Sequence, residues 1–83
     1  MKKNKNILLL LPLINMILMI QNHIEDQNFV TSEITRYNQN NPSLSCKHVY
    51  ANAEKTAVML YFDADVDFYI KITKSGWDII WKG

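Results

Sequence analysis

Three aspartates at alternate positions come closest to the spacing of a metal site. Asp63, Asp65 and Asp67 stand two residues apart, like the first ligands of a calcium-binding loop. An EF-hand loop also needs a glycine at its sixth position and a glutamate at its twelfth; this chain has Phe68 and Lys74 there. We therefore expect a solvated acidic turn, with cation binding by the three carboxylates as the alternative.

Cys46 and His48 form the second pair of residues with chemical potential. On a strand both side chains would project to one side, yet zinc needs three or four ligands and the other histidine, His23, follows the apolar N-terminal run. Same-face neighbours on a strand also lie roughly 7 Å apart, too far for a thiol and its base. We predict no catalytic residue, metal site or cofactor. Cys46 is the single cysteine; we expect a buried thiol, with a disulfide between two copies as the alternative.

Aromatic residues near the end of the chain offer a surface for a partner. Trp77, Ile79 and Trp81 alternate with polar residues, so both indoles are predicted to face the core. The alternative is an exposed aromatic platform for a sugar, a peptide or a membrane interface. Ile80 would lie on the opposite face beside Tyr69, where the two make a small apolar patch. The possible partner surface is therefore Tyr69, Trp77, Ile80 and Trp81.

The elements that carry these residues follow from hydrophobic periodicity. Residues 24–40 read as a helix with Val30, Ile34 and Tyr37 on one stripe, ending before Pro42. Alternation then predicts strands at 44–50, 56–62, 68–73 and 77–82, the last two joined by a turn in which Gly76 is available for a positive φ angle. We expect an α+β fold: an N-terminal hydrophobic helix, then one helix packed on a small antiparallel sheet of about four strands, a β-meander.

A short run in the last predicted hairpin resembles known domains. Gly76-Trp77-Asp78-Ile79 is similar to the run that closes the sheet in small helix-plus-curved-sheet domains of the cystatin and NTF2-like kind. This resemblance implies a curved antiparallel sheet and assigns no functional residue.

The N-terminal segment has the composition of a signal peptide or a membrane anchor. Three lysines precede the stretch from Ile7 to Ile20, which is apolar except at Pro12 and Asn15. Its fourteen residues span roughly 21 Å as a helix, which is short for a bilayer. No small-residue cleavage site follows Ile20, so cleavage and retention both stay open. We expect residues 1–22 to be the signal peptide or anchor and residues 23–83 to be a small extracytoplasmic domain.

Charge and size limit the function of that domain. Residues 21–83 carry six basic and eight acidic side chains, a net charge of about −2, which excludes a basic nucleic-acid surface. We predict a small exported or membrane-anchored binding protein without catalysis, whose partner is another protein or a second copy. The alternative is a small membrane protein that modulates a larger membrane complex through its N-terminal helix. Residues 7–20 would engage the membrane or the export machinery, and the domain would lie outside the cytoplasm, secreted or anchored, in the periplasm or at the surface of a bacterium.

Overall fold

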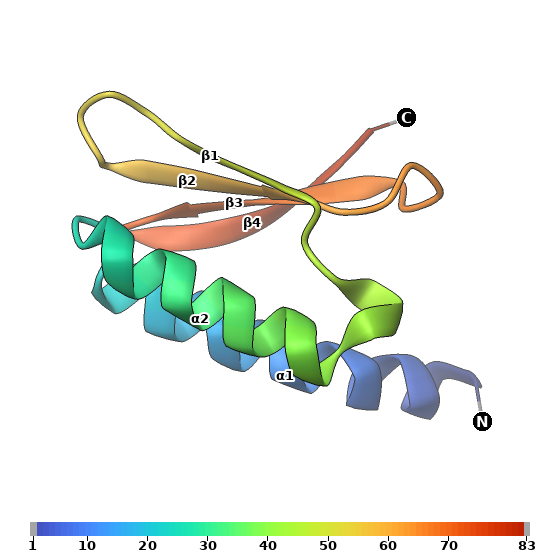
Figure 1. Cartoon of the computed structure of the whole chain (residues 1–83). Helices are drawn as coiled ribbons and strands as arrows, with labels where there is room; N and C mark the ends of the chain where they lie inside the picture. The colour runs from blue at the N-terminus through green and yellow to red at the C-terminus, as the bar shows by residue number, and fades with distance from the viewer. Residues whose placement is uncertain (1, 83) are drawn as a thin grey trace.

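The chain folds into a layer of two helices on a four-stranded sheet. The computed structural model describes the backbone of residues 2–82 and the side chains of residues 10–82. Both helices lie on the same side of the sheet (Figure 1), and the strands follow in the order β1-β2-β3-β4, each antiparallel to the next. The predicted α+β meander is confirmed. The elements are α1 (Lys2–Asn22), α2 (Gln27–Asn40), the 3₁₀ turn η1 (Pro42–Leu44), β1 (His48–Ala51), β2 (Ala57–Tyr61), β3 (Phe68–Thr73) and β4 (Gly76–Trp81).

Helix α1 belongs to the layer that covers the sheet. Its buried side chains are Leu13, Met16, Ile17 and Ile20, a spacing of three or four residues that places them on one face. That face packs against α2, β3 and β4. The expectation of a single covering helix is therefore incomplete, for a geometric reason. A helix is about 10 Å wide and strands lie about 4.8 Å apart, so one helix covers only about two strands.

Helix α2 forms the other half of that layer. Asp26 caps its N-terminus, since the carboxylate accepts a hydrogen bond from the Phe29 amide at 3.1 Å. This cap sets the start at Gln27, three residues after the predicted one. Val30, Ile34 and Tyr37 are buried as predicted.

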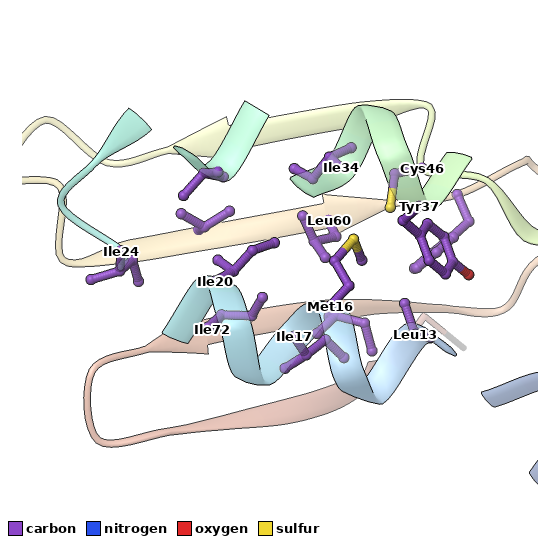
Figure 2. Packing of buried hydrophobic residues seen from close by; sticks show 14 residues of the cluster. Leu13, Met16, Ile17, Ile20, Ile24, Ile34, Tyr37, Cys46, Leu60 and Ile72 are labelled. Atoms are coloured by element: carbon purple, nitrogen blue, oxygen red, sulfur yellow. The ribbon is translucent and has the colours of Figure 1, made fainter. Parts of the chain in front are cut away.

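The interior of the sheet is made by the middle strands. Val58 lies opposite Ile72, and Leu60 lies opposite Ile70; all four side chains are completely buried. Figure 2 shows Leu60 and Ile72 pointing from the sheet into the same space as Met16 and Ile17 of α1 and Ile34 of α2.

Two local predictions are wrong. The first strand begins at His48, because Leu44 closes η1 and the chain then turns to bury Cys46. Gly76 has no positive φ angle and instead begins β4, opposite Thr73. The left-handed conformation occurs at Lys55, with φ 59°, in the β1–β2 turn.

The turn between β3 and β4 is fastened to the segment that joins the helices. The Gln21 side-chain amide donates to the Lys74 carbonyl oxygen at 3.2 Å, and the Lys74 ammonium pairs with the Glu25 carboxylate. These contacts hold one end of α1 against the sheet. Across the described residues, no helix has both the length and the apolar character to cross a membrane, so the predicted transmembrane helix is not found there.

Candidate binding surface

One face of the sheet has no covering layer among the residues that the structure describes. Strand alternation places the buried residues toward the helices and the residues between them on the other side, and both helices lie on one side (Figure 1). We call this uncovered side the open face. Its strand residues, matched by register, are His48, Tyr50, Ala57, Met59, Tyr61, Tyr69, Lys71, Thr73, Gly76, Asp78 and Ile80.

A row of side chains crosses all four strands on the open face. His48 lies opposite Tyr61, Tyr61 stacks on Tyr69 with ring centroids 4.7 Å apart, and Tyr69 lies opposite Ile80. We call His48, Tyr61, Tyr69 and Ile80 the cross-strand row. Tyr50 extends it, since its ring meets the edge of Tyr61 with centroids 5.4 Å apart. Such aromatic pairs contribute about 0.5–1.5 kcal/mol beyond the area they bury.

The neighbouring row on the same face is more polar. Lys71 lies between Met59 on β2 and Asp78 on β4, and both charged side chains are exposed. Opposite charges in this cross-strand position cancel at close range. The open face therefore offers aromatic stacking, apolar contact and tyrosine hydroxyl groups with little net charge.

The four residues predicted as a partner surface separate in the structure. Tyr69 and Ile80 lie together in the cross-strand row. Trp77 lies on the helix side, half-buried against the core. Trp81 also lies on the helix side, but at the end of the edge strand, where its side chain is 68% exposed. The prediction that both indoles are core is wrong for Trp81.

Trp81 is exposed at the end of β4, where the neighbouring elements leave a hollow beside its ring. Its ring meets Phe68 edge-on, with centroids 5.4 Å apart. Beside it is an open hollow of about 390 Å³, lined mainly by apolar side chains. Leu10 of α1 and Leu44 of η1 form the far wall of this hollow, so the two elements flank the indole without covering it.

The acidic turn does not gather its carboxylates. Asp63, Asp65 and Asp67 are all exposed in the β2–β3 loop. The loop is closed by backbone bonds, from the Val66 amide to the Asp63 carbonyl oxygen at 2.9 Å and from the Lys82 amide to the Asp67 carbonyl oxygen at 2.7 Å. Within the described part of the chain, no three His, Cys, Asp or Glu side chains are grouped as metal ligands.

Cys46 and His48 are not partners. The Cys46 side chain is in the core and its burial raises the pKa of the thiol to about 12, whereas His48 is exposed on the open face. A protonated, buried thiol is a poor nucleophile. The disulfide between two copies stays a prediction that requires Cys46 to become exposed.

A side chain that the sequence reading missed fixes this segment. Asn38 of α2 accepts a hydrogen bond from the Cys46 amide at 2.8 Å and donates one to the Cys46 carbonyl oxygen at 3.0 Å. Beside it, the Tyr37 hydroxyl donates to the Leu44 carbonyl oxygen at 2.7 Å. Burial, and then the nearby Cys46, raise the pKa of Tyr37 to about 12.

Sequence reasoning also missed how Tyr50 and His48 join Tyr61 and Tyr69. A first strand that begins at residue 44 places His48 on the same side as Cys46, whereas the observed strand begins at His48. The usable signal was the alternation of β2: Tyr61 follows the buried Leu60 and so faces away from the core.

Comparisons of this chain with protein-family models, with curated proteins and with solved structures find no match.

Proposed function

We propose that this chain is a small, non-catalytic binding protein that docks another polypeptide on the open face of its sheet. The observation that carries the proposal is the cross-strand row, in which Tyr61 stacks on Tyr69 on a face that no helix covers. Tyrosine suits such a role because its ring is apolar while its hydroxyl group accepts and donates hydrogen bonds.

The form and charge of the surface favour a protein partner over other ligands. Small-molecule sites are usually concave, whereas a row of rings on an uncovered sheet is broad and flat. Nucleic acids need a basic surface, and the strand residues of the open face carry one lysine, Lys71, opposite Asp78. A polypeptide can cover stacked rings and bond to their hydroxyl groups without a charge requirement.

The location of this activity is part of the proposal. The three N-terminal lysines and the apolar run still favour export. The packing of Ile17 and Ile20 in the core supports a chain that keeps this segment, because cleavage after it would expose the helix-facing side of β3 and β4. We therefore propose a domain outside the cytoplasm that retains α1, and the intact mass of the protein from its host would show whether it does.

A second candidate function uses the outer side of α1. Leu11, Leu18 and Met19 stay exposed after α1 has packed on the sheet, and three lysines precede them in the chain. This combination suits the surface of an anionic bilayer, where the protein would modulate a membrane complex. The two candidates use different residues and can be separated by binding to vesicles of anionic and neutral phospholipid. If the second candidate is correct, the parent protein binds these vesicles and Leu18→Ser removes the binding. Tyr69→Ala should leave vesicle binding unchanged.

Site-specific photo-crosslinking in the host cell tests the first candidate. A benzophenone amino acid placed at Tyr69 keeps an aromatic ring on the open face, and the matched control is the same amino acid at Gln39, an exposed position of α2. We expect a discrete adduct with a different polypeptide from position 69 and none from position 39, and we expect Tyr61→Ala to weaken the adduct. Identical adducts from both positions, or none from either, would refute the proposal.

A further inference from the structure

The free edge of β4 presents unpaired backbone groups. Lys82 donates its amide to the Asp67 carbonyl oxygen at 2.7 Å, so its amide points toward β3. Because backbone groups alternate along an antiparallel strand, the amides and carbonyls of Trp81, Ile79 and Trp77 point the other way, beyond the sheet. β4 ends the strand order, and no described strand pairs with that side.

The side chains along this edge are apolar. Ile79 is 39% exposed and Trp81 is 68% exposed, both on the helix side of β4. Soluble proteins usually protect such edges with several charges, proline or a bulge, whereas β4 has one charged residue, Asp78.

We propose that β4 pairs antiparallel with β4 of a second copy of this chain, so that two sheets join into one of eight strands. This pairing uses the sheet edge and is independent of the partner on the open face. A two-fold axis perpendicular to the sheet keeps both helix layers on one side.

Charge complementarity selects the register. When Ile80 lies opposite Ile80 of the second copy, Asp78 lies opposite Lys82 of the second copy, and Lys82 lies opposite its Asp78. On the helix side, Ile79 then meets Trp81 of the second copy. Shifting the centre to Ile79 instead would place Asp78 opposite Ile80 of the second copy, so the pairing would add no attraction between opposite charges of the two copies.

The oligomeric state of matched edge variants tests the pairing. Ile79→Lys places a charge at the centre of β4, and Val49→Lys places one at the other edge, on β1, where Val49 is 41% exposed on the same side of the sheet. By sedimentation, we expect the parent protein and Val49→Lys to be dimers and Ile79→Lys to be a monomer. A monomeric parent, or equal effects of the two lysines, would overturn the proposal.

Cysteine crosslinking tests the register without a destabilising charge. In a Cys46→Ser background, Ile80→Cys should give a disulfide-linked dimer on mild oxidation, because the Cα atoms of facing residues at a non-hydrogen-bonded position lie about 4.5 Å apart. Ile79→Cys should link poorly. Linkage at position 79 alone would overturn the register, and linkage at neither position would overturn the pairing itself.

A charge exchange provides a rescue. Lys82→Asp would place two carboxylates opposite each other at both ends of the pairing, and we expect the dimer dissociation constant to rise about tenfold. Adding Asp78→Lys restores opposite charges across the two-fold axis, so the double variant should dimerise more tightly than Lys82→Asp alone. If the double variant is the weaker of the two, the proposed charge pairing is wrong.

Discussion

Replacing Ile17 by alanine should destabilise the whole domain, because its side chain lies in the common core. Ile17 has no exposed surface, and it is clustered with residues of α2 and of the sheet. The matched control is the adjacent Leu18, which is 45% exposed on the same helix. Both substitutions leave alanine in the same turn of α1, and alanine is the best helix former.

The expected magnitudes differ clearly between the two positions. Truncating a buried isoleucine to alanine costs about 2–5 kcal/mol, since apolar contacts are lost and a cavity remains. A surface substitution usually changes stability by about 0.5 kcal/mol or less. A domain of this length has a free energy of unfolding of roughly 4–12 kcal/mol. Ile17→Ala should therefore remove a large share of the stability and Leu18→Ala only a small part.

Urea denaturation followed by far-UV circular dichroism measures both effects on the full chain. We expect the midpoint of Ile17→Ala to fall well below that of the parent, with an unfolding transition that remains cooperative. Each kcal/mol should lower the melting temperature by about 4–8 °C for a domain of this size. If the two variants unfold together with the parent, α1 does not belong to the domain core and the packing argument fails.

Three further predictions concern single contacts and pH. Gly76→Ala should raise stability by about 0.4–1 kcal/mol in urea denaturation, because the φ angle is not positive and an added Cβ meets no atom within 4 Å; a loss would mean that the turn needs glycine. Asn38→Ala should cost about 1–3 kcal/mol by the same measurement, because the Cys46 backbone loses both of its hydrogen bonds to that side chain, and an unchanged midpoint would show that water replaces them. Stability should fall as pH rises above about 9, because burial raises the pKa of Cys46 from 9.0 and of Tyr37 from 10.0, each to about 12. Above that pH the unfolded chain releases protons that the folded chain keeps. Cys46→Ser should make this loss of stability less steep, and a pH profile identical to that of the parent would refute the role of Cys46.

The strands and their faces could be predicted because strand alternation is a local signal. Val58, Leu60 and Phe62 repeat every second residue, and all three are buried. The stripe of α2 was predictable for the same reason. In α2, the sequence also shows which side is polar.

The placement of α1 could not be predicted in this way. Its segment is apolar on every side, so its periodicity does not indicate a buried face. The choice of Leu13 and Ile17 over Leu11 and Leu18 is made by the sheet, whose width needs a second helix. Composition alone indicates an export or membrane segment, while the structure shows a core element.

The cross-strand row and the position of Trp81 could not be predicted from the sequence for a different reason. Which side chains face each other across strands depends on register, and register depends on turns. Here the Asn52 side chain accepts hydrogen bonds from the Thr56 and Ala57 amides at 2.8 and 2.9 Å, which fixes the β1–β2 turn. The exposure of Trp81 depends on how α1 and η1, which are both distant from it in sequence, border the hollow beside its ring.

The preference of aromatic residues for β-strands does not by itself explain the aromatic side chains on the open face. Polar residues can form the solvent-exposed face of a sheet, and this chain has two of them on the same side of β3, where Lys71 and Thr73 follow Tyr69. The apolar residues are instead aligned across strands, so that Tyr61, Tyr69 and Ile80 adjoin one another. A chain this short buries only about 60% of its unfolded surface, so leaving aromatic area in water forgoes stabilisation. Contact with a partner would recover it.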